Sequence, residues 1–117
     1  MLLKDKAAVI TGCNRGIGKK ILEIFSKNNA VIFACVRKID TSFKSLISDI
    51  SKEYNNKIIP IEVNFEDFES VKVSAQSIID KNIPIEILIN NAGIIENSLF
   101  QMTTIKNLKK IFDVNFF

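Results

Sequence analysis

Three glycines lie close together near the start of the chain, and their spacing suits the binding of a phosphate. Gly12, Gly16 and Gly18 fall within the eight residues TGCNRGIG that begin at Thr11. Glycine lets a backbone turn tightly and approach a pyrophosphate, and a helix that starts at such a turn directs its first N–H groups at the phosphates. Three glycines can also form nothing more than a tight turn, so the elements on either side decide the weight of the pattern.

The segments that flank these glycines are those that a phosphate-binding turn needs. An apolar run, Ala7–Thr11, precedes them, and apolar residues recur behind them at helical spacing, namely Ile17, Ile21, Ile24 and Phe25. This pattern predicts a strand, a loop and a helix. A second apolar run covers residues 30–36 without alternation, which is typical of a parallel strand that is covered on both faces.

The alternation of helices and strands continues through the middle of the chain. A helix is predicted from about Ser42, a plausible N-cap, up to the pair Asn55-Asn56. Residues 57–63 predict a third strand, in which Pro60 argues for an edge position or a local irregularity because proline cannot donate a ladder hydrogen bond.

Two helices and one strand are predicted in the last part of the chain. A helix begins at about Asp67, a strand covers residues 85–89, and a last helical face follows Thr103-Thr104 and runs to Phe117 without a stop signal. Helices and strands that alternate over short connections favour right-handed βαβ units. We therefore expect an α/β fold, a Rossmann-type doubly wound parallel sheet in three layers (αβα), truncated after the fourth strand and its following helix.

Two further motifs turn the pattern into a specific resemblance. Residues 90–93 read Asn-Asn-Ala-Gly directly after the predicted fourth strand, and Asn115 follows in the last predicted helix. Together with the Thr-Gly-x-x-x-Gly-x-Gly spacing, these motifs resemble the short-chain dehydrogenase/reductase family over essentially the whole chain. The resemblance implies that residues 1–117 are the N-terminal part of a single NAD(P)-binding Rossmann domain, with the catalytic C-terminal half absent.

The second predicted strand ends in a way that favours NADP(H) over NAD. Sites for NAD normally place an acidic residue at this strand end, where it binds the ribose 2′-hydroxyl, but here Val36 is followed by Arg37. Arg37 and Arg15 could hold a 2′-phosphate with charge-assisted bonds. NAD is the less favoured cofactor, for which Asp40 is the alternative ribose acceptor. Asn64 stands where many relatives have an aspartate that binds the adenine amino group.

The resemblance assigns most of these residues to the cofactor and one to catalysis. It implies that Asn115 organises the active-site proton relay. The cofactor-binding set that it implies comprises Gly12, Asn14, Arg15, Gly16, Ile17, Gly18, Arg37, Asn64, Asn90, Asn91, Ala92 and Gly93. No metal site is expected, because the chain has two cysteines and no histidine.

The family's proton donor is missing from the chain. In the family a tyrosine, assisted by a lysine four residues later, protonates the substrate oxygen, and a serine positions the carbonyl. The single tyrosine, Tyr54, is followed at that distance by Ile58. The resemblance therefore implies an NADP-dependent oxidoreductase that transfers hydride between NADPH and a carbonyl or alcohol substrate. A 3-oxoacyl group is one candidate substrate, beside a sugar, a steroid or a short ketone. This chain would be the cofactor-binding half of that enzyme and inactive alone. A non-catalytic, truncated nucleotide-binding or interaction module is the alternative.

Composition limits the partners of the protein. The net charge of +3 is too small and too evenly spread to indicate nucleic-acid binding. No apolar run reaches membrane-spanning length and charges interrupt the N-terminal residues, so we expect a cytoplasmic protein without a membrane partner. A small carbonyl or acyl substrate is expected, and the resemblance implies a homo-oligomer for the full-length protein.

Overall fold

Strands and helices alternate strictly along the part of the chain that the structure describes. The structure is a computed structural model, and it describes residues 2–89. The predicted last helix, residues 90–93 and Asn115 lie outside the described residues. The elements in chain order are β1 (Ala7–Thr11), α1 (Gly16–Lys27), β2 (Val31–Val36), α2 (Thr41–Tyr54), β3 (Ile58–Glu62), α3 (Phe68–Asp80) and β4 (Ile87–Ile89).

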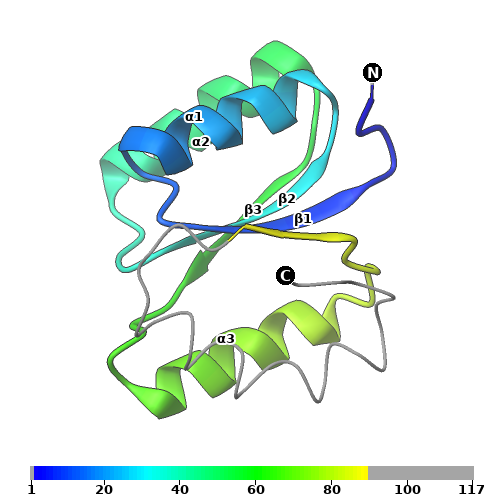
Figure 1. Ribbon diagram of the computed structural model, residues 1–117. Helices are drawn as coiled ribbons and strands as arrows, with labels where there is room; N and C mark the ends of the chain where they lie inside the picture. Colours follow the sequence, from blue (N-terminus) through cyan, green and yellow to red (C-terminus); the bar gives the residue numbers. More distant parts are fainter. Residues whose placement is uncertain (1, 90–117) are drawn as a thin grey trace.

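The four strands form one parallel sheet in the order β3-β2-β1-β4. Helices α1 and α2 cover one face of this sheet and α3 lies against the other, so the molecule has three layers (Figure 1). This arrangement confirms the doubly wound parallel fold. Because β1 pairs with β2 on one side and β4 on the other, the chain changes direction across the sheet at β1. The outer position of β3 also explains how Pro60 is tolerated.

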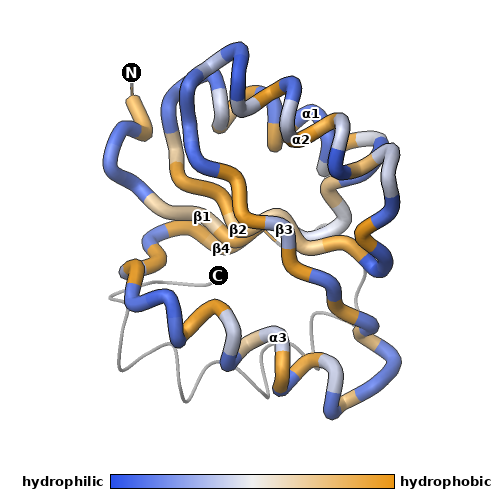
Figure 2. Tube along the Cα trace, turned by 180° about the vertical axis from the view of Figure 1, so that it is seen from behind, coloured by the Kyte–Doolittle hydropathy of each residue, from blue (hydrophilic) through white to orange (hydrophobic). Residues whose placement is uncertain are grey.

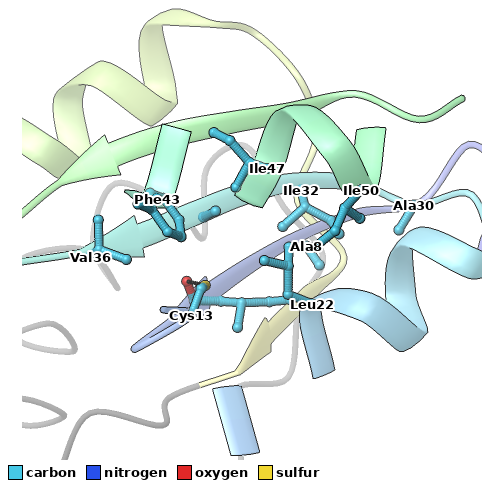
Figure 3. Packing of buried hydrophobic residues seen from close by; sticks show 11 residues of the cluster. Ala8, Cys13, Leu22, Ala30, Ile32, Val36, Phe43, Ile47 and Ile50 are labelled. Carbon is cyan, nitrogen blue, oxygen red and sulfur yellow. Dashed lines mark hydrogen bonds between the residues drawn. The ribbon is translucent and has the colours of Figure 1, made fainter. Parts of the chain in front are cut away.

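Two apolar clusters, one on each face of the sheet, hold the layers together. Side chains alternate along β1, so that Val9 packs towards α3 whereas Ala8 and Ile10 pack towards α1 and α2. The strands form an apolar band between the more polar outer surfaces of the helices (Figure 2). In the α1–α2 cluster, Leu22 and Phe43 point from their helices onto the strands (Figure 3). The continuous apolar runs of β1 and β2 follow from this cover on both faces.

Helix α1 turns a different face to the sheet from the one that its isoleucines suggest. Ile17 is 70% exposed and Ile24 is 50% exposed, whereas Gly18, Leu22 and Ser26 are buried. The buried positions are four residues apart, and the two small ones let the helix approach the strands closely. The predicted helix is confirmed, but its predicted apolar face was wrong in part, since Ile21 and Phe25 pack against the core whereas Ile17 and Ile24 do not.

The N-terminal ends of α2 and α3 are fixed by aspartates. The Asp40 side chain accepts a hydrogen bond from the backbone N–H of Phe43 at 2.8 Å, so Asp40 and not Ser42 is the N-cap of α2. Asp67 accepts from the backbone N–H groups of Glu69 and Ser70, which confirms the predicted start of α3. Strand β4 is shorter than the predicted strand 85–89, because it begins at Ile87. The backbone N–H of Glu86 nevertheless donates to the Ala7 carbonyl at 3.0 Å.

Within residues 2–89, no helix combines the length and the apolar character that crossing a membrane requires.

The two cysteines are reduced and buried on opposite faces of the sheet. Cys13 belongs to the cluster beneath α1 and α2, and Cys35 belongs to the cluster that faces α3. Burial raises the pKa of the Cys13 thiol to about 12, and the thiol donates a hydrogen bond to the Ile10 carbonyl at 3.0 Å. Burial, and to a smaller extent the neighbouring Cys13 thiolate, also raises the pKa of Cys35.

The buried Cys13 thiol is expected to make the protein less stable in alkaline solution. An unfolded cysteine loses its proton near pH 9.0, whereas the folded thiol keeps it up to about pH 12. The folded state therefore binds one proton more in this interval, and its free energy of unfolding falls as the pH rises. Replacing Cys13 with alanine is expected to reduce this slope by about 1.4 kcal/mol per pH unit above pH 9. Urea unfolding of both proteins at several alkaline pH values measures the difference, and equal slopes would contradict it.

Candidate functional site

A pocket of about 600 Å³ opens at the carboxyl ends of three neighbouring strands. Its walls come from the loops that follow β1, β2 and β3, and this is the edge at which open α/β sheets bind their ligands. The lining residues are Gly12, Asn14, Arg15, Gly16, Ile17, Cys35, Val36, Arg37, Val63, Asn64 and Phe65.

Two glycines allow the loop after β1 to turn into α1. Gly12 and Gly16 have φ angles of 64° and 59°, in the left-handed region that residues with a side chain rarely adopt. The Gly12 N–H donates to the Cys35 carbonyl at 3.0 Å, which ties the loop to the end of β2. Apart from its chain neighbours and the backbone of its own helix, a Cβ added at Gly16 would meet no atom within 4 Å. The bare backbone at Gly16 therefore forms part of the pocket wall.

The N-terminus of α1 differs from those of α2 and α3. Arg15 occupies the N-cap position and its side chain makes no capping hydrogen bond, whereas an aspartate caps each of the other two helices. The first N–H groups of a helix have no partner within the helix, and the helix dipole makes this end favourable for an anion. Because the end of α1 also borders the pocket, an anionic group in the pocket would meet these donors.

The residues at the end of β2 form another part of the pocket lining. The Arg37 side chain is 70% exposed, and its Nη2 lies 3.9 Å from Oε2 of the equally exposed Glu66. Asp40, the alternative ribose acceptor, caps α2 through its Oδ1 and is not among the residues that line the pocket. Arginine, and not a carboxylate, is therefore the charged group that the β2 loop presents to the pocket.

Asn64 also lines the pocket and is held in a tight turn after β3. Its Oδ1 accepts from the backbone N–H of Glu66 at 3.0 Å, and its own backbone N–H donates to Oγ of Ser70 at 2.9 Å. An amide oxygen can accept a second hydrogen bond and the amide nitrogen can donate two. The side chain is thus oriented by the protein and still able to bind a polar ligand.

The structure brings together all but one of the assigned cofactor residues that lie within residues 2–89. The exception is Gly18, which is buried in α1 and does not line the pocket. Asn90, Asn91, Ala92, Gly93 and Asn115 lie outside the described residues. Sequence reasoning did not assign four of the lining residues to the cofactor site, namely Cys35, Val36, Val63 and Phe65. Their positions at the carboxyl ends of two predicted parallel strands could have indicated that they line the site. In the described part of the chain, no group of His, Cys, Asp and Glu side chains could hold a metal ion.

A Rossmann-type sheet with a glycine turn and a pocket at its carboxyl edge defines the dinucleotide-binding class of fold. A family model described as "short chain dehydrogenase" matches residues 6–117 of this chain. The chain therefore belongs to the short-chain dehydrogenase/reductase family of oxidoreductases.

Relatives with described activities share this family. The chain is 27% identical over 113 residues to a 3-oxoacyl-[acyl-carrier-protein] reductase of Aquifex aeolicus, covering 97% of this chain and 45% of that protein. It is 30% identical to an acetoacetyl-CoA reductase of Synechocystis, covering 97% of this chain and 42% of that protein. The chain thus spans less than half the length of these curated relatives.

Solved structures confirm the fold. L-sorbose reductase from Gluconobacter frateurii, complexed with NADPH and L-sorbose, superposes with a TM-score of 0.80 at 21% identity, covering 92% of this chain and 49% of that one. At this identity the likeness concerns the fold alone.

Proposed function

We propose that this chain is the NADP(H)-binding half of an oxidoreductase that transfers hydride between the nicotinamide and a carbonyl or alcohol group. The observation that carries the proposal is the pair of arginines at the pocket. Arg15 and Arg37 line it, and the place of the usual acidic residue at the end of β2 is taken by Val36. A guanidinium group binds a phosphate with paired, charge-assisted hydrogen bonds, whereas it offers no acceptor to a ribose hydroxyl.

Three parts of the cofactor would meet matching parts of the pocket, namely the pyrophosphate, the 2′-phosphate and the adenine. The glycine turn and the uncapped end of α1 would hold the pyrophosphate through backbone N–H groups, and Arg37 would hold the 2′-phosphate. Asn64 would bind the adenine edge through its oriented amide. When bound, the cofactor supplies or accepts the hydride, which is chemistry that no side chain can perform. Residues 90–93 and Asn115 are included in the proposed site by their motifs alone.

The proposed substrate class follows from the relatives. Two of them reduce 3-oxoacyl or acetoacetyl thioesters, and we extend this class of small carbonyl or acyl substrates to the whole protein. The chain would then be the N-terminal part of one dinucleotide-binding domain, in a full-length protein that assembles as a homo-oligomer. A cytoplasmic location also stays a prediction.

The 117-residue chain is expected to bind NADPH without oxidising it. Hydride transfer to a ketone requires a proton donor, and Tyr54 lies on α2 with its ring packed against the α1–α2 cluster and no lysine four residues later. Incubation of the purified chain with NADPH and acetoacetyl-CoA is expected to give no loss of nicotinamide absorbance above the protein-free rate. Whole enzymes commonly turn over at about 1 per second or faster. NADPH oxidation by the chain at that rate would overturn the proposal that it is inactive alone.

A further inference from the structure

The loop that carries Arg37 is held at both ends by two consecutive residues of the neighbouring chain segment. Before Arg37, the carbonyl of Val36 accepts a hydrogen bond from the Val63 N–H at 2.9 Å. After it, the backbone N–H of Ile39 donates to Oε1 of Glu62 at 2.9 Å. The intervening residues, Arg37 and Lys38, are exposed. Their path is therefore set by these two contacts.

The two contacts differ in kind. The Val63 bond is made by the backbone and continues the pairing of β2 with β3, whose last register partners are Val36 and Glu62. The Glu62 bond is made by a side chain, and it ties a residue beyond the end of β2 back to the last residue of β3. Only the second contact can be removed by a substitution without disturbing the pairing of the strands.

We propose that Glu62 is a positioning residue for cofactor selection: its carboxylate fixes the loop so that the Arg37 guanidinium stays at the pocket rim, where a 2′-phosphate would bind. Arg37 lines the pocket but Glu62 does not, so Glu62 acts through the loop and not on the cofactor. Glu62 contacts the loop by accepting the hydrogen bond from the backbone N–H of Ile39. This inference rests on the proposed function, since it assigns a role to a residue behind the proposed phosphate site.

The orientation of Arg37 depends on its backbone because its only charged partner within residues 2–89 is Glu66, at 3.9 Å, and both side chains are largely exposed. Such exposed pairs hold a side chain weakly. A fixed backbone reduces the number of conformations that the guanidinium must give up when it binds a phosphate. Loss of the Glu62 bond would therefore weaken binding of NADPH and leave NADH, which has no 2′-phosphate, unchanged.

A double-mutant cycle with Arg37 tests the proposal. In the Arg37-containing protein, Glu62→Ala is expected to raise the Kd for NADPH roughly two- to tenfold, the range of one solvent-exposed hydrogen bond, with the Kd for NADH unchanged. Glu62→Gln keeps an acceptor oxygen and is expected to restore NADPH binding. In the Arg37→Ala background, Glu62→Ala is expected to have no further effect, because the group that it positions is gone.

The matched control is Glu86→Ala, which removes another exposed glutamate, one that pairs with Lys6 at 2.8 Å away from the pocket. It is expected to leave both Kd values unchanged. An equal rise in the Kd values for NADPH and NADH on Glu62→Ala would overturn the positioning role. So would the same effect of Glu62→Ala with and without Arg37. In either case Glu62 would only stabilise the fold. If Arg37→Ala itself leaves NADPH binding intact, the proposed phosphate site fails first, so the two failures are distinguishable.

Discussion

Replacing Gly16 with valine is expected to weaken the binding of both NADPH and NADH by about a hundredfold or more, equivalent to about 2.7 kcal/mol. Gly16 lines the pocket and its Cβ position is free of protein atoms, so the valine side chain would occupy space that the pyrophosphate needs. The φ angle of 59° adds strain of roughly 1–2 kcal/mol, which lowers the free energy of unfolding. Titration calorimetry with each cofactor measures the binding loss, and thermal unfolding measures the strain.

A matched variant separates the two effects. Asn55 ends α2 with a φ angle of 54° and does not line the pocket, so Asn55→Val introduces comparable strain at a distance. It is expected to lower the thermal stability to a similar extent while both cofactors bind normally. Normal cofactor binding by Gly16→Val would show that the pocket does not receive the pyrophosphate.

Replacing Arg37 with alanine is expected to raise the Kd for NADPH by about tenfold or more and to change the Kd for NADH little. A hydrogen bond to a charged group contributes about 1.5–3 kcal/mol, and Arg37 is the arginine that the β2 loop presents to the pocket. The effect depends on the 2′-phosphate, so the selectivity between the two cofactors is the informative quantity. Fluorescence titration of the nicotinamide in the wild-type and variant proteins provides it.

A second substitution at the same contact is expected to act in the opposite direction. Glu66 lies 3.9 Å from Arg37 and would repel the incoming phosphate, so Glu66→Gln is expected to lower the Kd for NADPH about two- to fivefold, within the range of exposed ion pairs. The gain should diminish at high ionic strength. Equal changes for NADPH and NADH in either variant would contradict recognition of a 2′-phosphate by Arg37.

The elements of the sheet were predictable because their signals are local. Residues 7–11 and 30–36 are apolar without alternation, and parallel strands covered on both faces have that pattern. Pro60 indicated an edge position or a local irregularity for the third strand, and the strand order shows the edge position. The glycine turn was predictable too, since left-handed φ angles at Gly12 and Gly16 require this residue type.

The errors arose where two local signals competed. Asp40 and Ser42 are both good N-caps, and only the folded loop decides that the Asp40 carboxylate reaches the N–H of Phe43. In α1 the isoleucines suggested the buried face, but the sheet selects Gly18 and Ser26 because small residues permit close packing. Hydropathy alone does not contain that information.

The contacts that shape the pocket rim could not be predicted from the sequence. Glu62 and Glu66 reach Ile39 and Arg37 only because β3 lies beside β2 in register. Both glutamates have the sequence appearance of ordinary exposed residues. Their relation to the β2 loop depends on tertiary pairing, as does the contribution of Val63 and Phe65 to the pocket wall.

The most direct test is the affinity of the unmodified protein for NADPH and for NADH, measured by calorimetric titration under identical buffer and salt conditions. We expect saturable binding of NADPH with a Kd at least about tenfold lower than that for NADH, the difference that one charge-assisted phosphate contact provides. Binding of NADH as tight as that of NADPH would contradict the NADP(H) site at Arg37, and no binding of either would contradict a cofactor pocket at the carboxyl edge of the sheet.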